Sequence, residues 1–505
     1  MSLLKRNMAA NFAGSLWGSI MGLIFIPLYI KFLGIESWGL IGIFTTLQGM
    51  FGLLDMGLSS TLNREMARLS ALPDKEQEMR DLVCTLEVIY WALAVFVGVT
   101  AISLSPFISH QWVKAEGIST ETIEQALLLM GFVMALQMPV GFYTGGLMGL
   151  QQQVLLNAIS VSVSTLRGAA TVLILWLISP TIQAYFTWQI VICIINISLL
   201  KYFLWRSLPS SDKKAIFKKQ LLKGIWRFAA GMSGISIAVV ILTQLDKVML
   251  SKLLSLEMFG YYMLASIISM GLGRVYSPVI FSIYPRLTQL VSINDQNELI
   301  QLYHKSCQFI AVLILPAAVV LAFFSYEVIL LWTQNTLTAG KIYVLVSILT
   351  CGTAINVLMG MPYILQLSFG WTRLSFFKTL IAVVLLVPLI IYMTKHYGAN
   401  GAAIAWLVLN LSIFFLEVPI MHRRILCNEM WQWYWQDVAV PFLTVFIVAG
   451  LGRLFFTGAT SHFMILINLV VISVLTLGIS VITTRVTREW LSAKYLKVNK
   501  QLKIE

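Results

Sequence analysis

The run NFAGSLWGSIMGLIFIPLYI, Asn11 to Ile30, contains no Asp, Glu, Lys or Arg. A helix needs about 20 mostly apolar residues to cross the hydrocarbon core of a bilayer, and this run has that length. Further runs of the same character follow along the chain. The expected spans are 10–31, 37–61, 83–106, 123–148, 156–178, 182–204, 225–250, 257–282, 307–330, 340–365, 374–394, 399–420, 438–456 and 462–484. The sequence therefore predicts an all-α integral membrane protein of about 14 transmembrane helices.

The composition of the whole chain agrees with a membrane protein. Of its 505 residues, 58% are hydrophobic and 11% are charged, whereas ordinary soluble domains have about 45–50% and about 25%. The mean hydropathy is +0.84. Spans and short loops leave no room for a soluble enzymatic domain. The net charge of +13 lies in short loops between apolar runs, so it predicts no nucleic-acid partner.

The basic residues predict how the chain is oriented. An even number of spans puts both termini on one side, and most of the 35 Lys and Arg residues fall on that side. By the positive-inside rule, both termini are expected in the cytoplasm. The first span lacks a small-x-small cleavage site and is expected to stay uncleaved. Basic amphipathic stretches at 63–81, 211–224 and 485–505 are expected as surface helices on anionic lipids of the cytoplasmic leaflet.

An internal repeat predicts two lobes. Residues 33–39 (LGIESWG) match 254–260 (LSLEMFG) at an offset of 221, and Trp188 meets Trp406 at an offset of 218. Two six-span units in the same orientation are related by an axis along the membrane normal. The expected parts are an N-terminal lobe 1–206 (spans 1–6), a basic cytoplasmic linker helix 207–224, a C-terminal lobe 225–424 (spans 7–12), spans 13–14 at 425–484, and a basic cytoplasmic tail 485–505.

Ionisable groups deep in spans are candidate site residues, because each costs about 2.5–3.5 kcal/mol on insertion. The candidates are Arg167, Arg274, Asp246, Lys247 and Asp55, with Arg64 at the cytoplasmic mouth of the second span. A guanidinium in mid-membrane needs a carboxylate, a phosphate or water as its partner. Polar stripes at helical spacing accompany two of the candidates. They are Asn157, Ser160, Ser164, Arg167 and Thr171 on span 5, and Thr45, Gln48, Gly52, Asp55 and Ser59 on span 2.

Other roles remain open for these residues at this stage. The small and hydroxyl members of the stripes also suit helix packing. Asp246 and Lys247 also suit a pair with each other or with a neighbouring helix, and Lys247 suits snorkelling to the interface. Asp55 is also suited to act as the counter-ion of an arginine, and Arg64 is also suited to anchor its helix at the membrane interface. Charged residues close to span ends are expected at the membrane interface; they are Glu87, Glu327, Glu417 and Arg453.

Motifs for catalysis, cofactors and metals are absent from the sequence. There is no Walker A pattern, no HExxH and no GxSxG elbow. The 5 cysteines have no CxxC spacing, so they predict neither a disulfide framework nor a zinc site. We therefore expect no cofactor, no metal and no catalytic residues, and a transporter rather than an enzyme.

Several motifs resemble a known family. The most specific are 11–17 (NFAGSLW), 54–58 (LDMGL), 245–250 (LDKVML) and 284–287 (YPRL). They resemble bacterial polysaccharide (O-antigen) flippases, the polysaccharide transporter branch of the multidrug/oligosaccharidyl-lipid/polysaccharide exporter superfamily. The resemblance covers essentially the whole chain.

The resemblance implies a specific activity. The substrate would be an undecaprenyl-pyrophosphate-linked oligosaccharide, carried from the cytoplasmic to the outer leaflet of the bacterial inner membrane. Two lobes would alternate their access around a central cationic cavity. Arg167, Asp246, Lys247 and Arg274 match positions of cavity charges, and Asp55 and Arg64 match the end of the second span. The family also implies coupling to H+ or Na+ and contacts with polysaccharide polymerase machinery.

Two other functions fit the sequence less well. A multidrug or cation antiporter of the same superfamily should present net acidic charge in its cavity, whereas the candidates here are mostly positive. A membrane-embedded polysaccharide polymerase would normally need a sizeable catalytic loop on the outer side of the membrane. The longest outward loop expected, about 107–122, is short.

Overall fold

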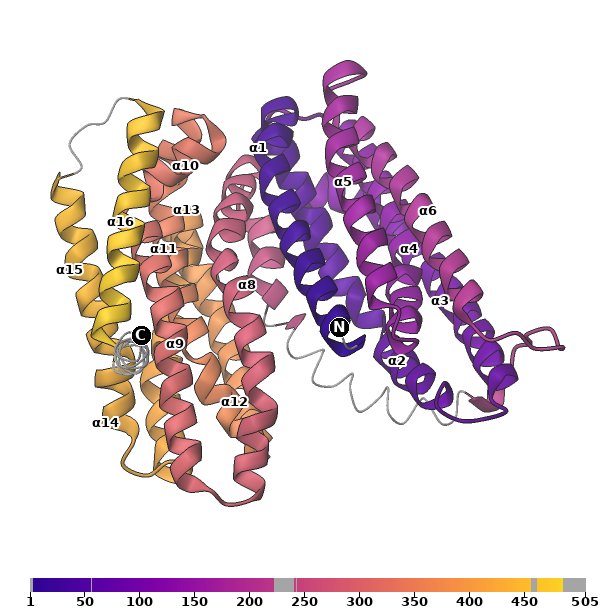
Figure 1. Ribbon diagram of the computed structural model, residues 1–505. Coiled ribbons are helices and arrows are strands. Elements are labelled where there is room, and N and C mark those ends of the chain that lie inside the picture. The colour runs from indigo at the N-terminus through magenta and orange to yellow at the C-terminus, as the bar shows by residue number, and fades with distance from the viewer. Residues whose placement is uncertain (1–2, 56, 222–239, 242, 456–460, 485–505) are drawn as a thin grey trace, which may run out of the picture. The chain divides into compact units, whose positions relative to one another are not determined.

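The computed structural model describes residues 3–55, 57–221, 240–241, 243–455 and 461–484, and Figure 1 shows its helices. Every regular element in these residues is a helix. The chain divides into two compact units, Met1–Gly260 and Tyr261–Glu505, and each is described by itself. The expected basic tail at 485–505 and the first part of the expected seventh span lie outside the described residues.

The first unit consists of helices that pack along one another. Its elements are α1 (Leu3–Phe51), η1 (Gly52–Asp55), α2 (Leu58–Leu69), α3 (Glu76–Phe107), η2 (Ile108–Trp112), α4 (Thr120–Gly149), α5 (Gln153–Leu177) and α6 (Ile182–Ser207), followed by a helix at 243–253. α4 packs against α3, α2 and α6, while α5 packs against α1 and α6. Large buried side chains such as Tyr90, Phe142 and Tyr143 fill the space between α3 and α4.

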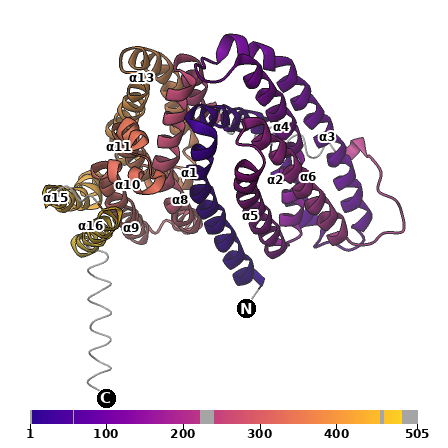
Figure 2. The same cartoon turned by 90° about the horizontal axis from the view of Figure 1, so that it is seen from above.

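The second unit is also helical. Its elements are α8 (Leu256–Ser292), which begins at the end of the first unit, α9 (Gln296–Phe323), α10 (Ser325–Thr333), α11 (Thr336–Leu358), α12 (Gly360–Ser368), α13 (Thr372–Arg424), α14 (Met430–Gln432), η3 (Trp433–Ala439), α15 (Val440–Phe455) and α16 (His462–Thr483). The last pair, α15 and α16, packs against α9, and both views show α15 beside α16 (Figures 1 and 2). Buried Tyr303 and Trp433 belong to the core of this unit.

The described residues contain 11 helices long and apolar enough to cross a membrane. The all-α membrane class is confirmed. Two of these helices, Ala9–Asp55 with 47 residues and Thr372–Arg424 with 53, would each exceed about 70 Å, against a hydrocarbon core of about 30 Å. Each covers two expected spans and has non-helical backbone between them, at Gly34 (φ 79°, ψ 166°) and at Gly398 (φ 58°, ψ −140°). The expected seventh span lies mostly outside the described residues, so the count of fourteen stays a prediction.

Contacts at one end of the first unit agree with the expected alternation of loops. The Glu36 carboxylate accepts hydrogen bonds from the backbone N–H groups of Glu116 (2.8 Å) and Gly117 (3.1 Å). The Leu256 N–H donates to the Lys114 carbonyl at 2.7 Å. The break at Gly34, the turn after η2 and the start of α8 therefore lie at the same end. The side of the membrane to which that end belongs stays a prediction.

The two copies of the repeated heptapeptide contact each other within this unit. A Cβ added at Gly39 would lie under 3.0 Å from the Leu256 carbonyl oxygen, and one added at Gly260 would lie under 3.0 Å from the Ile35 carbonyl oxygen. Ile35 and Leu256 are themselves equivalent at the offset of 221. Each copy thus places its glycine on the equivalent backbone position of the other, the pattern of a two-fold contact. We name this contact the glycine crossing.

The linker helix expected within 207–224 is wrong for the described part, because residues 208–218 are not helical. Side chains on α3 bind the backbone N–H groups that a helix would use itself. The Asp81 carboxylate accepts from the Ile216 N–H at 2.9 Å, and the Thr85 hydroxyl accepts from the Lys218 N–H at 2.9 Å. The Lys218 ammonium also lies 2.6 Å from Asp81. Side-chain acceptors that offer the backbone another partner compete with helix formation.

The surface helix expected at 63–81 is also wrong as a single element. α2 ends at Leu69, and α3 begins at Glu76 and continues as a span. Between them Asp74 has a left-handed φ of 54°, which interrupts a helix.

Candidate functional site

The first unit contains a cavity of about 750 Å³. α1, η1, α2, α4, α5 and α6 contribute its walls. Apolar side chains make up part of the lining, and the polar lining residues are Asn11, Gln48, Asp55, Ser59, Gln137, Thr144, Asn157, Ser160, Ser164, Arg167 and Asn196. Small-molecule sites combine an apolar wall with a few convergent polar groups in this way.

The polar stripe on α5 faces this cavity. Asn157, Ser160, Ser164 and Arg167 all line it, as the three- and four-residue spacing along one helix face predicts. Close packing fixes this face, because a Cβ at Gly168 would overlap the Phe25 ring of α1. The helix therefore has little freedom to rotate and carries Arg167 into the cavity.

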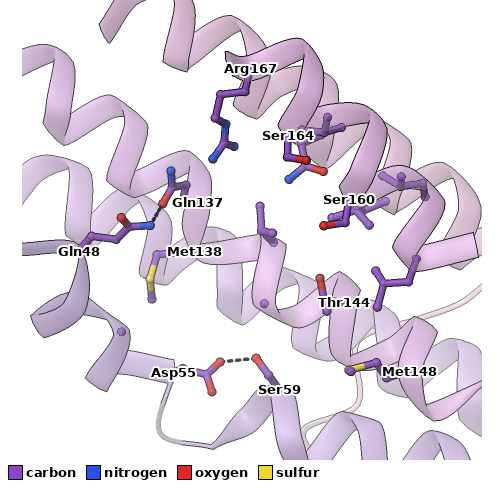
Figure 3. Close-up of a pocket in the computed structure, with 18 of the residues that line it drawn as sticks. Gln48, Asp55, Ser59, Gln137, Met138, Thr144, Met148, Ser160, Ser164 and Arg167 are labelled. Atoms are coloured by element: carbon purple, nitrogen blue, oxygen red, sulfur yellow. Dashed lines mark hydrogen bonds between the residues drawn. The ribbon is translucent and has the colours of Figure 1, made fainter. Parts of the chain in front are cut away.

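Arg167 brings a positive charge to a largely neutral wall. Its side chain is half-buried, and its buried Nε has no hydrogen-bond partner among the described residues. Figure 3 shows the guanidinium directed into the cavity. A guanidinium directed into a cavity favours an anionic ligand, since hydrogen bonds between ionised groups are the strong ones.

Asp55 lies on the other side of the cavity, at the end of η1 (Figure 3). Its carboxylate accepts hydrogen bonds from the hydroxyls of Ser59 and the fully buried Tyr90. Those two hydroxyls also lie 3.0 Å from each other. The structure thus gives Asp55 hydroxyl partners on α2 and α3, which hold the carboxylate in place.

Neutral amides connect the walls. Gln48 on α1 donates a side-chain hydrogen bond to Gln137 on α4 (Figure 3). The Asn157 amide donates to Asn11 Oδ1 at 2.6 Å, which joins α5 to α1. Amides and hydroxyls both donate and accept hydrogen bonds, so this wall can bind sugar hydroxyls. The site as a whole offers one guanidinium, one carboxylate and many neutral polar groups.

The remaining predicted site residues do not line this cavity. Arg64 is exposed, with its guanidinium 3.9 Å from Glu65. Arg274 is exposed on α8. The structure brings only Arg167 and Asp55, of the six candidates, into this cavity.

Asp246 and Lys247 pair with each other, one of the roles left open by the sequence. The Lys247 ammonium lies 3.3 Å from Asp246 and donates to the Thr243 carbonyl at 2.7 Å. The Lys247 side chain is 8% exposed. Snorkelling of Lys247 is wrong, because the ammonium turns back to its own helix.

Sequence reasoning missed the lining residues on α4 and α6. These are Gln137, Thr144 and Asn196, and Tyr90 on α3 was missed as a partner of Asp55. A search for amides inside expected spans would have found Gln137 and Asn196, since an amide in an apolar span is also costly.

Comparisons with known proteins place the chain among transporters. Residues 4–291 match the family described as Polysaccharide biosynthesis protein. A Shigella flexneri protein named "Putative O-antigen transporter" is 21% identical over 407 residues, which cover 80% of this chain and 94% of that protein.

Solved structures share the fold. The lipid II flippase MurJ, in an inward closed conformation, aligns with a TM-score of 0.67 and 14% identity over 94% of this chain and 98% of that one. An inward-facing multidrug resistance MATE family transporter of the MOP superfamily aligns with a TM-score of 0.64 and 14% identity, over 81% of this chain and 96% of that one. At such identities the likeness concerns the fold.

Proposed function

This chain belongs to the polysaccharide biosynthesis protein family, and from that premise we propose that it carries undecaprenyl-pyrophosphate-linked oligosaccharide repeat units from the cytoplasmic to the outer leaflet of the inner membrane. The family and its relatives are transporters and flippases, not enzymes. The family therefore supports a general function, that of a flippase-type transporter for a lipid-linked polysaccharide. The lipid carrier, the direction and alternating access of two lobes are parts of the proposal.

The cavity beside Arg167 carries the proposal. The Arg167 guanidinium, which is directed into the cavity, suits the oxygens of the pyrophosphate, because guanidinium–phosphate hydrogen bonds are charge-assisted and fork-shaped. The surrounding amides and hydroxyls suit the sugars. The polyprenyl tail would remain in lipid, since its apolar surface gains nothing from a polar cavity.

The other charged candidates keep their proposed roles. Asp246, Lys247 and Arg274 are proposed to contribute to the central cationic cavity, and Asp55 and Arg64 to the cytoplasmic half of the path. Asp55 would act by holding Ser59 at the cavity wall, while the buried Tyr90 fixes the carboxylate from behind. We further propose that transport is coupled to H+ or Na+ and that the protein contacts a polysaccharide polymerase.

A cation or multidrug antiporter is the second candidate, since MATE transporters share the fold. A cation site should carry surplus negative charge. The cavity instead has one arginine and one aspartate among its lining residues, and the aspartate is already bound by two hydroxyls. This balance favours a ligand with neutral sugars and an anionic group.

Deletion of the gene in its native host, followed by complementation with variants, tests the proposed function. The measurement is the amount of surface glycan and the leaflet in which single lipid-linked repeat units accumulate. We expect repeat units trapped on the cytoplasmic face in the deletion strain. R167A should restore at least tenfold less surface glycan than the unaltered chain, and R167K should restore an intermediate amount, because lysine keeps the charge but not the fork.

R206A is the matched control, since Arg206 lies at the end of α6, stacks on Tyr202 and does not line the cavity. It should complement fully at equal membrane content. Single units that reach the surface without polymerisation would contradict the flippase and indicate a polymerase. Unchanged glycan with greater drug sensitivity would indicate the antiporter.

A further inference from the structure

A histidine lies between two carboxylates in the second unit. On α9, His304 Nδ1 is 2.5 Å from Asp437 Oδ2 of η3, and His304 Nε2 is 3.1 Å from Glu429 Oε2 in the connection between α13 and α14. Gln308, one turn further along α9, donates to the other Asp437 oxygen at 2.8 Å. Asp437 is fully buried and His304 is 5% exposed. The proposed transport site does not use this cluster.

The hydrogen bonds of the cluster require an added proton. Each of the two N···O contacts needs one hydrogen between its atoms. A neutral imidazole carries a single N–H, and an ionised carboxylate carries none. The observed geometry therefore holds one proton more than neutral His304 with two carboxylates, on the imidazole or on one carboxylate. If that proton leaves, two lone pairs face each other and one contact must open.

The contact to Glu429 is the one that would open. It is the longer of the two, and the Glu429 side chain is 22% exposed, whereas that of Asp437 is 0% exposed. Asp437 also keeps its bond from Gln308. η3 is a π-helix, a form that recurs at functional sites. Loss of the proton would thus detach the Glu429 side chain from α9. Glu429 belongs to the connection 425–429, which leads from α13 into the last pair of spans.

The groups around the cluster do not neutralise it. Tyr303 and Cys307 on α9, and His422 and Glu417 on α13, are the titratable groups that face it. Glu417 is bound by the Lys378 ammonium at 2.9 Å and 3.0 Å. His422 donates from Nδ1 to the Val418 carbonyl at 2.9 Å. The neighbouring cations are exposed; they are Lys305, Arg423 and Arg424.

We propose that His304, Asp437 and Glu429 form a proton-binding site whose deprotonation detaches the Glu429 side chain from α9, and that the proton bound there is the coupling ion of the transporter. The second half of this statement rests on the proposed function, and the first half does not. The site makes the release of Glu429 depend on proton concentration, and Glu429 is the member through which solvent protons reach His304.

A fluorine probe near Glu429 tests the site without any substrate. Cys427 is exposed in the same connection. The substitutions C84A and C351A remove the other two cysteines that a label could reach, because the remaining two are buried. A trifluoromethyl label on Cys427 is followed by NMR between pH 5 and pH 9 in the purified full chain. We expect a single pH-dependent change of the signal, which H304Q and E429Q abolish. E298Q is the matched control, because Glu298 also lies on α9 but pairs with Arg286 at the surface, and it should keep the change.

A signal that does not change with pH, or a change that persists in both H304Q and E429Q, would overturn the site. If H304Q is not recovered folded, E429Q alone decides, since it alters a partly exposed side chain. Coupling is measured separately, by transport of the lipid-linked oligosaccharide in vesicles with and without a pH gradient. Loss of the gradient effect in E429Q supports coupling, and its retention overturns it. A fluorine change without any transport would leave the site standing and overturn the proposed function.

Discussion

The glycine crossing in the first unit gives a prediction that can be worked out from the structure. G39A places a methyl group under 3.0 Å from the Leu256 carbonyl oxygen, whereas ordinary van der Waals contacts lie at 3.4–4 Å. The two segments must separate by about 1 Å to restore an ordinary contact, and backbone atoms cannot rotate away as a side chain could. Overpacking of this kind costs about 1–3 kcal/mol.

The matched control is G22A, since Gly22 lies in the same helix α1 and a Cβ there would meet nothing within 4 Å. Both substitutions gain the same helix propensity, about 1 kcal/mol, so their difference isolates the steric cost. G39A should therefore be about 1–3 kcal/mol less stable than G22A. The assay is thermal unfolding in detergent, with about 1–2 °C in Tm expected for each kcal/mol, because the entropy of unfolding grows with the length of the chain.

The reciprocal arrangement adds a second test. G260A places its methyl group against Ile35 in the same crossing, and one separation of the segments relieves both overlaps. The double variant G39A/G260A should thus cost clearly less than the sum of the single variants, a coupling typical of residues in contact. Equal stability of G39A and G22A, or strict additivity in the double variant, would refute the reasoning.

Two further predictions concern backbone conformation. D81N should weaken the attachment of the linker 208–218 to α3. The Asp81 carboxylate binds the Ile216 N–H and the Lys218 ammonium, and the substitution removes its charge. Trypsin should then cleave the linker several-fold faster than in E78Q, whose altered side chain only pairs with Lys75. G34A should lower Tm although a Cβ there would meet nothing within 4 Å, because φ 79° with ψ 166° costs a residue with a side chain about 1–3 kcal/mol. G18A, also in open space, should not lower Tm, and an equal Tm for these two variants would contradict the strain.

The membrane spans were predictable because their signal is local. A window of about 20 residues decides whether a helix can cross the bilayer, and the 11 helices of the described residues coincide with expected spans. The expected gaps at 32–36 and 395–398 contain the backbone breaks at Gly34 and Gly398, although the helices on either side run together. The stripe on α5 was predictable for the same reason, since helical spacing alone brings Asn157 and Arg167 to one face.

The partners of charged residues were not predictable. Glu87, Glu327 and Glu417 were expected at the membrane interface from their places near span ends, and that expectation stays a prediction. The structure adds that each is buried and paired with a distant residue. Glu87 lies 2.6 Å from Lys201, Glu327 lies 2.5 Å from Arg453, and Glu417 is bound by Lys378. These pairs join residues 39 to 126 positions apart, so no local pattern contains them. His304 was likewise overlooked, because its carboxylate partners are 125 and 133 positions away.

The sequence by itself determined that this chain is an all-helical membrane protein, roughly where its apolar spans lie along the chain, and which residues share a helix face. These properties follow from the apolar content and the 3.6-residue period of short segments. Only the tertiary structure decided that Arg167 and Asp55 line one cavity, that Asp81 holds the linker extended, and that His304 lies between two carboxylates. These properties depend on which helices pack together, because a buried charge is tolerated only where the fold supplies its partner.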